Sequence, residues 1–428
     1  MAGRRKHVVV VGGGFGGLAA VGRLAAEPVD VTLVDRRNYH LFQPLLYQVA
    51  TAGLSPADIA APIRSIVNRN PRVRVLLDEM TGVVPGANRI ALATDATLDF
   101  DYLVIATGAQ HSYFGKDHWA AHAPGVKTID DATRVRRSIL VAMERAETNR
   151  QENVARREAF LTFVVVGGGP TGVEIAGAVA ELTRQTVAMD FRFITPKCVR
   201  IILVQSADRL LPGFPEDLSQ SAKQALESLG VQVRLSQRVT DIDAAGVTIG
   251  EERIETTTVI WAAGVQASGA GAWLGAATDG AGRVVVGSDL STPDRPEVFV
   301  IGDTACVTDA AGRAVPGIAP AAKQQGHYVA EVIAARLGGR PSPPPFRYRH
   351  QGSLATIGRQ RAVADFGWLR LRGFPAWLLW STAHLFFLVG FRNRIVVGAN
   401  WLWNYLTFDH GARLITGADL PAAVSPMM

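Results

Sequence analysis

Two stretches of the chain show the same change of pattern, from a run of apolar residues to closely spaced glycines and then to a helical pattern. The run His7–Val11 leads into Gly12–Gly17, and the run Phe163–Val166 leads into Gly167–Gly172. A short uninterrupted apolar run predicts a buried strand of parallel sheet, and apolar residues three and four positions apart predict the helix that follows. We therefore expect two strand–turn–helix units.

A second feature of the pattern also repeats. Asp101–Gly108 is a short apolar strand ending in Thr-Gly, and Val259–Val265 contains an equivalent strand that leads into Ala-Ala-Gly. Each segment follows its own glycine turn, and the two segments lie about 155 positions apart. The duplication has the scale of a domain, since solenoid repeats are only about 20 to 50 residues long.

The remaining pattern extends this organisation. A strand within Glu297–Asp303 and a helical pattern over Pro320–Leu337 follow the second unit, and we assign both to the first. The proline-rich run Arg340–Pro345 predicts a boundary. We predict a first Rossmann-like unit, a connecting helical segment, a second unit, a return to the first unit and a C-terminal region, at residues 1–115, 116–160, 161–285, 286–340 and 341–428.

The first glycine turn has the spacing of a dinucleotide-binding fingerprint. The first glycine allows the tight bend, the second lets backbone N–H groups approach a pyrophosphate, and the third allows the helix to pack closely on the strand. The helix N-terminus stabilises the phosphate charge. An acid about 20 residues on binds the ribose, and Asp35 ends the next predicted strand. The predicted first nucleotide site is Gly12, Gly14, Gly16, Gly17 and Asp35.

The second glycine turn has the same spacing but lacks the acid. Its next predicted strand, Arg200–Gln205, ends in glutamine. A neutral amide can bind ribose hydroxyls without repelling a 2′-phosphate, and Arg209 is close enough in sequence to meet such a phosphate. Both NADH and NADPH therefore remain open. The predicted second nucleotide site is Gly167, Gly169, Thr171, Gly172, Gln205 and Gly264.

Several longer motifs extend over nearly the whole chain, at Gly12–Gly17, Phe42–Ala50, Gly167–Glu174, Trp261–Gly264 and Ile301–Asp303. Together they resemble the type II NADH dehydrogenases, the single-subunit NADH:quinone oxidoreductases that do not pump protons. Glutathione-reductase-like flavoproteins in general share the glycine turns and the Gly-Asp pair, whereas the runs FQPLLYQVA and GPTGVE are more specific to this family. The expected fold class is α/β, with two Rossmann-like dinucleotide-binding domains of the glutathione-reductase-like flavoprotein type and a C-terminal membrane-associating helical module.

The resemblance implies a chemistry for each unit. It implies FAD in the first unit, with Asp303, next to Gly302, reaching the ribityl chain and with Thr107 and Gly108 near the isoalloxazine ring. It implies NADH in the second unit. Hydride would pass from NAD(P)H to FAD, and two electrons would then pass to a membrane quinone without a metal.

Three residues are candidates for catalysis. According to the resemblance, Glu174 lies close to the nicotinamide and the flavin, where a carboxylate could orient the nucleotide or relay a proton. Its place also suits an ordinary first-turn acid that complements the helix dipole. The family's quinone-side signature, Ala-Gln-x-Ala-x-Gln-Gln, corresponds to Ala319–Gln325, with proline in place of the first glutamine. Gln324 and Gln325 remain candidates for a quinone pocket, and the alternative is a polar helix face without a ligand.

The C-terminal region differs from the rest in charge and aromatic content. The chain has a formal net charge of +6, and ten arginines against three aspartates place the whole excess after residue 339. Arginine and tryptophan beside the apolar run Phe374–Phe391 favour a membrane surface over nucleic acid. We predict a helical hairpin completed by Trp401–Phe408. The resemblance implies peripheral attachment to the cytoplasmic face of the cell membrane, and a homodimer.

Composition limits the alternatives. Apolar residues make up 48% and charged residues 19% of the 428 residues, which is typical of a folded protein. Cys198 and Cys306 have no redox-pair or metal-site spacing, which disfavours a disulfide or sulfide:quinone flavoprotein. A soluble ferredoxin or rubredoxin reductase and a non-enzymatic nucleotide-binding flavoprotein are the remaining rivals, and the arginine- and tryptophan-rich tail disfavours the soluble reductase.

Overall fold

The computed structural model describes residues 4–67, 70–149, 154–308, 312–407 and 411–417. Two compact units are built from alternating parts of the chain. The first unit contains residues up to Phe42, Ala60–Ser112 and Gly264–Gly352. The second contains Gln43–Ile59, Tyr113–Ala263 and the residues from Ser353 onward.

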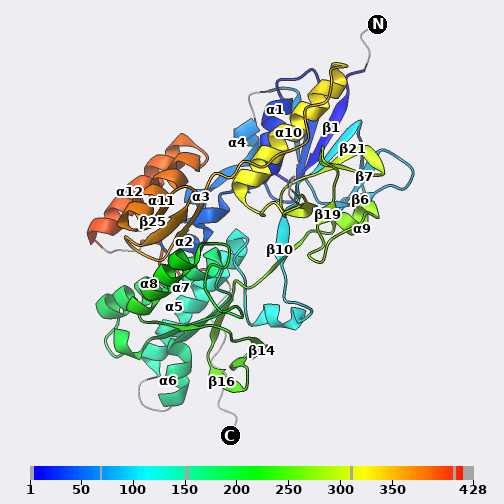
Figure 1. Cartoon of the computed structure of the whole chain (residues 1–428). Helices are drawn as coiled ribbons and strands as arrows, with labels where there is room; N and C mark the ends of the chain where they lie inside the picture. The colour runs from blue at the N-terminus through cyan, green and yellow to red at the C-terminus, as the bar shows by residue number, and fades with distance from the viewer. Residues whose placement is uncertain (1–3, 68–69, 150–153, 309–311, 408–410, 418–428) are drawn as a thin grey trace. The chain divides into compact units, whose positions relative to one another are not determined.

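The first unit is built on a sheet of six strands. In order these are β20 (Ser291–Thr292), β21 (Arg295–Val300), β9 (Tyr102–Ile105), β1 (His7–Val11), β2 (Asp30–Asp35) and β5 (Val73–Leu77), and all neighbours except β20 and β21 are parallel. The four valines of β1 are buried, as expected of a central parallel strand. Helix α1 (Phe15–Leu24) follows β1, which confirms the first predicted strand–turn–helix unit (Figure 1).

Helix α10 (Ala319–Leu337) packs against α1 in the first unit, and both lie beside β1 in Figure 1. The helices approach closely because they meet at glycines. A Cβ atom at Gly16 would lie 3.1 Å from the Ala322 carbonyl oxygen, and one at Gly326 would lie 2.2 Å from that of Gly16. The return of the chain to the first unit through β21 and α10 agrees with the predicted assignment of these two segments.

Smaller elements complete the first unit. They are β3 (Tyr39–Leu41) with β4 (Ala60–Pro62), α4 (Ile63–Val67), the antiparallel strands β6 (Met80–Val83), β7 (Arg89–Leu92) and β8 (Thr97–Asp99), β10 (Ala109–His111) with β18 (Val265–Ala267), α9 (Ala270–Leu274), β19 (Val284–Val285) with β22 (Ala305–Cys306), and the single turn η4 (Gly302–Thr304).

The second unit has a parallel sheet in the order β13 (Val231–Arg234), β12 (Arg200–Val204), β11 (Thr162–Val166) and β17 (Thr258–Trp261). Helix α7 (Pro170–Asp190) follows β11, which confirms the second predicted unit. Its other elements before the C-terminal region are η1 (Gln43–Leu45), α2 (Leu46–Ala50), α3 (Pro56–Ile59), η2 (Asp117–Ala121), α5 (Ile129–Thr148), α6 (Val154–Leu161), η3 (Pro196–Cys198), α8 (Glu216–Ser228), β14 (Val239–Asp243), β15 (Gly246–Ile249) and β16 (Glu252–Glu255).

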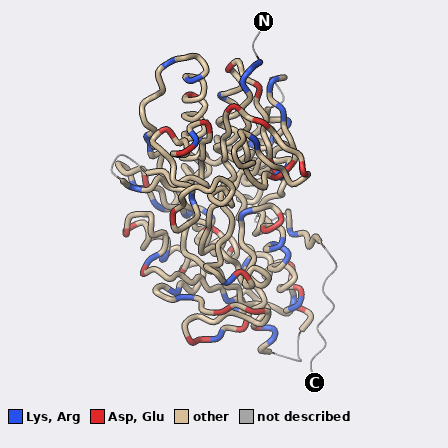
Figure 2. The backbone as a smooth tube through the Cα atoms, turned by 90° about the vertical axis from the view of Figure 1, so that its right-hand side faces the viewer, with Lys and Arg blue, Asp and Glu red and all other residues tan. Residues whose placement is uncertain are grey.

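The C-terminal region begins with a sheet that the sequence pattern did not predict. Strands β23 (Ser353–Thr356), β24 (Ala362–Asp365) and β25 (Arg370–Gly373) are antiparallel, and β23 packs against α7. The guanidinium group of Arg370 lies 3.3 Å from Asp217 of α8. Figure 2, a backbone tube coloured by residue type, shows Lys and Arg interspersed with Asp and Glu along the chain. Part of the predicted basic surplus is therefore paired within the second unit.

Two helices follow this sheet and form the predicted hairpin. Helix α11 (Phe374–Phe387) ends before Gly390, whose φ of +90° reverses the chain, and α12 (Phe391–Thr407) then packs back on α11. The predicted stretch from Trp401 continues to Thr407 within α12, and Phe408 lies outside the described residues. Within the described ranges, no helix is long and apolar enough to cross a membrane.

Candidate functional site

The first candidate site lies along one edge of the six-stranded sheet. Parallel neighbours β21, β9, β1 and β2 end at the same edge, and each is followed by candidate residues. The candidates at the ends of these four strands are, in the same order, Gly302 and Asp303, Thr107 and Gly108, Gly12 and Gly14, and Asp35. This is the edge at which open α/β sheets bind nucleotides.

The fingerprint turn has the geometry that its spacing predicts. Gly12 has a φ of +103°, and a Cβ atom at Gly17 would lie 1.8 Å from the Gly12 carbonyl oxygen. A Cβ atom at Gly14 would meet nothing within 4 Å, and Gly14 is the N-cap of α1. The turn therefore leaves an open approach at the positive end of the helix, which suits a pyrophosphate. Gly16, in contrast, allows α1 to pack closely on α10.

Asp35 is held in place by two backbone N–H groups. Its Oδ2 atom accepts a hydrogen bond from Gly13 at 2.5 Å, and its Oδ1 atom accepts one from Arg37 at 2.7 Å. Each carboxylate oxygen can accept a further hydrogen bond, so ribose hydroxyls can still bind. His40 supports the same turn through its Nδ1 atom, 3.0 Å from the Gly13 carbonyl oxygen.

The other end of this site contains a cluster of hydroxyl groups. The Oγ1 atom of Thr107 lies 2.6 Å from the Oγ atom of Ser268. Thr304, which is buried, donates to the Gly108 carbonyl at 3.1 Å. The sequence analysis missed Ser268 and Thr304, because only the pairing of β10 with β18 and the turn η4 bring them to Thr107. Gly264 also belongs to this unit, where its carbonyl accepts from the Ser112 N–H group.

The two glutamines predicted for a quinone pocket have other partners in the first unit. The buried Gln325 accepts a hydrogen bond from the Gly302 N–H group at 2.6 Å and so fixes the turn that carries Asp303. Gln324 makes two hydrogen bonds of 2.9 Å with the backbone of Arg349. A role in quinone binding stays a prediction for both.

The second unit repeats the first fingerprint turn. Gly167 has a φ of +109°, a Cβ atom at Gly172 would lie 1.8 Å from the Gly167 carbonyl oxygen, and a Cβ atom at Gly169 would meet nothing within 4 Å. Gly169 is the N-cap of α7, and Thr171 is exposed in the first turn of that helix. The turn can therefore accept a second pyrophosphate.

Gln205 takes the position that Asp35 has in the first unit. Its Oε1 atom accepts a hydrogen bond from the Gly168 N–H group at 2.8 Å, as Asp35 accepts from Gly13. The remaining Nε2 group is a hydrogen-bond donor, where a carboxylate would present an acceptor and a negative charge. The guanidinium group of Arg209 donates to the Pro212 carbonyl within the following loop.

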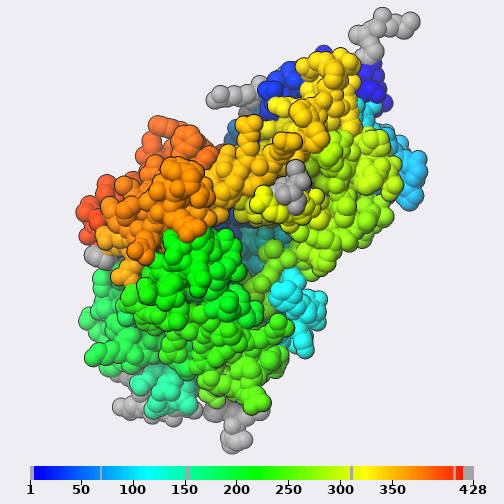
Figure 3. All heavy atoms as spheres, in the orientation of Figure 1, coloured from blue at the N-terminus to red at the C-terminus, as the bar shows by residue number. Residues whose placement is uncertain are grey.

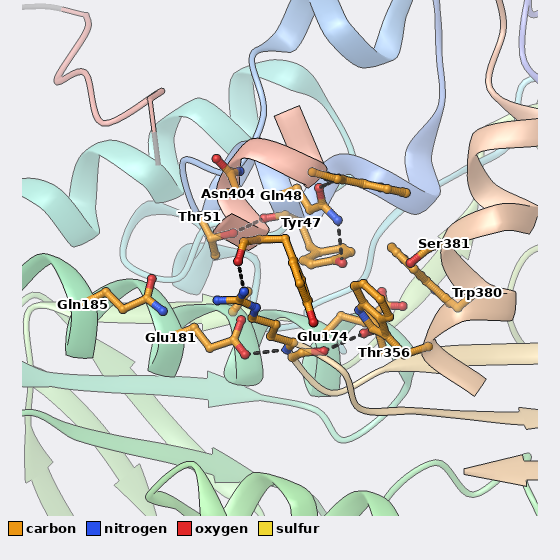
Figure 4. Close-up of a pocket in the computed structure, with 17 residues that line it drawn as sticks. Tyr47, Gln48, Thr51, Glu174, Glu181, Gln185, Thr356, Trp380, Ser381 and Asn404 are labelled. Atoms are coloured by element: carbon orange, nitrogen blue, oxygen red, sulfur yellow. Dashed lines mark hydrogen bonds between the residues drawn. The ribbon is translucent and has the colours of Figure 1, made fainter. Parts of the chain in front are cut away.

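A pocket in the second unit lies on the helix that the second turn begins. It encloses about 810 Å³, including the space at its open mouth, and Figure 4 shows the side chains that line it. Much of its wall is aromatic and comes from α2, α11 and α12. The aromatic lining residues are Tyr47, Trp377, Trp380, Trp401 and Tyr405.

Two carboxyl groups of α7 line the same pocket, two helical turns apart. Burial raises the pKa of Glu174 to about 8, although a hydrogen bond from the Thr356 backbone opposes the shift. Burial also raises the pKa of Glu181, which accepts a hydrogen bond from the Arg359 N–H group. Glu174 can therefore hold or release a proton near neutral pH, which an ordinary glutamate cannot do. The sequence analysis missed Glu181 and the aromatic wall.

The two cysteines are both free thiols. Cys198 ends the single turn η3 in the second unit, and Cys306 ends β22 in the first.

Comparison with known proteins identifies two matching family models. The model described as pyridine nucleotide-disulphide oxidoreductase matches residues 6–326, and the model described as NDH2 C-terminal domain matches residues 350–408. Together they extend over both nucleotide-site turns and the C-terminal sheet and helices.

Two relatives from Mycobacterium tuberculosis are similar over almost the full length. The chain is 44% identical to the type II NADH:quinone oxidoreductase NdhA, over 97% of this chain and 90% of that protein. It is 43% identical to the type II NADH:quinone oxidoreductase Ndh, over 96% and 91%. The structure of NDH2 from Plasmodium falciparum in complex with NADH has the same fold, with a TM-score of 0.86 and 21% identity, over 97% of this chain and 100% of that chain.

Proposed function

The chain belongs to the type II NADH:quinone oxidoreductase family, and from this premise we propose that it oxidises NADH and reduces a quinone with the help of FAD. The overall reaction converts NADH, one proton and a quinone into NAD⁺ and a quinol. When bound, FAD accepts a hydride from the nicotinamide and passes the two electrons on. The protein supplies binding, orientation and the proton.

The edge of the six-stranded sheet fits FAD. The open approach at Gly14 and the N-terminus of α1 accommodate the pyrophosphate, and Asp35 binds the adenosine ribose. Gln325 fixes the Gly302 turn from which Asp303 reaches the ribityl chain. NADH binds at the equivalent turn of the second unit, where Gly169 leaves the same space and Gln205 faces the ribose.

The pocket on α7 is the proposed quinone site. Its aromatic walls suit a flat apolar ring, and its lining includes carboxyl groups. Because the pKa of Glu174 is about 8, its carboxyl group is protonated at neutral pH and can give a proton to the quinone oxygen. Solvent then reprotonates it. Gln324 and Gln325 act on the quinone only indirectly in this proposal, through the elements that they hold.

The single observation that supports this function most strongly is the occurrence of two complete fingerprint turns in one chain. A redox enzyme that joins two dinucleotides needs both, and a single binding module needs one. The test is to add NADH to the flavin-loaded protein without oxygen and then add a soluble quinone. We expect the flavin absorbance to bleach and then to return. A flavin that NADH does not bleach, or that the quinone does not reoxidise, contradicts the proposal.

We also propose that α11 and α12 attach the protein to the membrane. These helices lie on the surface of the second unit, in orange and red in Figure 3. Large apolar side chains are exposed along them: Leu378, Phe386, Phe391, Ile395, Leu402, Trp403 and Leu406. An apolar face that stays exposed beside arginines is typical of a helix that lies at a membrane interface.

Substitution tests this attachment better than truncation, because Trp380 and Trp401 also wall the pocket. We expect the double variant Leu402→Glu and Leu406→Glu to lose binding to liposomes of anionic lipid while keeping NADH oxidation with a soluble acceptor. Leu77→Glu is the matched control, because Leu77 of the first unit is 60% exposed and Leu402 is 61% exposed. Unchanged liposome binding of the double variant would contradict the assignment.

Attachment on the cytoplasmic side and a homodimer are further parts of this proposal. The first rests on the resemblance and on the arginine-rich C-terminal region. Protease accessibility in sealed inverted vesicles tests the side, and sedimentation in detergent tests the dimer.

A further inference from the structure

A chain of hydrogen bonds in the second unit fixes which way the Tyr47 hydroxyl points. The Trp401 indole Nε1 atom donates to Gln48 Oε1 at 2.8 Å, and Gln48 Nε2 donates to the Tyr47 hydroxyl oxygen at 2.8 Å (Figure 4). An indole N–H group can only donate, so the Gln48 amide can have only this orientation. The Tyr47 oxygen therefore accepts, and its own proton is left to donate elsewhere.

The Tyr47 side chain lines the pocket, where other donors are also available. Trp380 is 2% exposed, and its indole Nε1 atom has no hydrogen-bond partner among the described residues. The Oγ atom of Ser381 is likewise buried and without a partner in the described part of the chain. Buried donors of this kind are costly unless something accepts from them. An acceptor that enters the pocket would satisfy these donors.

Aromatic rings shape the space around these donors. The Tyr47 ring centroid lies 6.3 Å from that of Trp380, which lies 5.6 Å from that of Trp401. A flat molecule with carbonyl oxygens on its ring edge matches both the stacking surfaces and the donors. A quinone head group has this chemistry.

We propose that Tyr47 donates a hydrogen bond to a carbonyl oxygen of the quinone and that Gln48 is the positioning residue that directs this donor into the pocket. The inference rests on the proposed function of the pocket. No bond to hydrogen breaks in this step, because Tyr47 keeps its proton. The hydrogen bond strengthens as the quinone oxygen gains negative charge with the electrons, so it favours the transition state over the bound quinone. The proton that the oxygen finally takes comes from Glu174 or from solvent.

The charge environment supports a donor role for Tyr47. Burial raises the pKa of its hydroxyl well above the ordinary value, and the nearby carboxyl groups of Glu174 and Glu181 raise it further. The hydrogen bond from Gln48 opposes the shift only in part. Tyr47 is therefore neutral throughout the working pH range.

The first test compares Tyr47→Phe with the wild type, using ubiquinone-1 and ferricyanide as alternative electron acceptors. Ferricyanide has no carbonyl oxygen, so it cannot use the donor. Loss of one hydrogen bond to an oxygen that becomes charged predicts a fall in kcat/KM for the quinone of about tenfold to a hundredfold. We expect kcat/KM with ferricyanide and the KM for NADH to stay within about twofold. Tyr113→Phe is the matched control, because Tyr113 is as buried as Tyr47 and donates to the Ala123 carbonyl outside the pocket.

The second test keeps the tyrosine and turns its hydroxyl proton away from the pocket. In Gln48→Glu, a carboxylate accepts from both Trp401 and Tyr47, so the Tyr47 proton turns away from the pocket. We expect the same loss with the quinone as in Tyr47→Phe. Because both changes remove one donor, the double variant should be no worse than either single variant.

Three results would overturn the inference. They are an unchanged kcat/KM for the quinone in Tyr47→Phe, an equal loss with ferricyanide, and additive losses in the double variant. A wild type that reduces ferricyanide but not ubiquinone-1 would instead contradict the proposed function. Melting temperatures of all variants separate loss of the donor from loss of folding.

Discussion

Replacing Gln205 by glutamate tests how the second unit selects its nucleotide. The Gln205 side chain accepts from the Gly168 N–H group through Oε1, and glutamate can keep this bond with one carboxylate oxygen. What changes is the group that faces the ribose. The Nε2 donor becomes a charged acceptor, as in Asp35 of the first unit. The substitution therefore alters charge while preserving the turn.

The magnitude follows from two effects that act in the same direction. Two unit charges at about 4 Å repel by about 1 kcal/mol in bulk water and by about 4 kcal/mol at an effective dielectric constant of 20. Gln205 is partly exposed, so the repulsion of a 2′-phosphate lies between these limits. The hydrogen bond that the Gln205 Nε2 group can donate to that phosphate, worth about 1.5 to 3 kcal/mol, is lost as well. The two effects add to at least about 2.5 kcal/mol, so we expect kcat/KM for NADPH to fall by a factor of about 70 or more.

The assay is the ratio of kcat/KM for NADH to kcat/KM for NADPH in the wild type and in Gln205→Glu. The wild type should use both nucleotides, and the variant should favour NADH by the factor above. Gln205→Met is the control, because it removes the polar atoms without adding charge and should weaken both nucleotides together. If the ratio in Gln205→Glu equals that of the wild type, position 205 does not face the ribose.

Four further variants test the other parts of the site. Glu174→Gln should remove the fall in quinone reduction that occurs as pH rises through about 8, because the protonated carboxyl group is the active form. A carboxyl group whose pKa is raised from 4.5 to about 8 on folding costs stability that accumulates as pH rises between these two values, so the variant should also melt higher than the wild type at pH 9 but not at pH 4. Gly14→Ala should fold but lose FAD on gel filtration, whereas Gly17→Ala should fail to fold, because its Cβ atom would overlap the Gly12 carbonyl oxygen. Gly169→Ala should keep its flavin and raise the KM for NADH at least tenfold, as steady-state kinetics can show.

The strand–turn–helix units could be predicted because their signals are local. A buried parallel strand is a continuous apolar run, and the turn needs glycines where the backbone has positive φ or the helix meets the strand. Gly12 and Gly17 meet these needs in the first unit, and Gly167 and Gly172 meet them in the second. The helical hairpin was predictable for the same reason, from the apolar run Phe374–Phe391 and the aromatic stretch Trp401–Phe408, whereas the turn at Gly390 was not predicted.

The pocket could not be predicted, because no local pattern marks it. Its wall is assembled from α2, α7, β23, α11 and α12, which are distant in the sequence. Sequence spacing places Glu174 in a first helical turn, but only its burial in the fold, where α2 and β23 pack against α7, raises its pKa. The motif around Tyr47 and Gln48 pointed to the family without indicating what either side chain does. Gln325 shows the same limit, since its hydrogen bond to the Gly302 turn is a contact that the motif did not indicate.

The two nucleotide turns also show why a glutamine can stand where the first unit has an acid. The first requirement at this position is an acceptor for the N–H group of the residue that follows the first fingerprint glycine, which is Gly13 in one turn and Gly168 in the other. A carboxylate and an amide oxygen both satisfy it, so the turn itself does not select between Asp35 and Gln205. Only the nucleotide distinguishes them, because only a 2′-phosphate interacts differently with a charge and with a neutral donor. The residue at this position can therefore change without loss of the fold, and we expect its identity to influence which nucleotide the unit accepts.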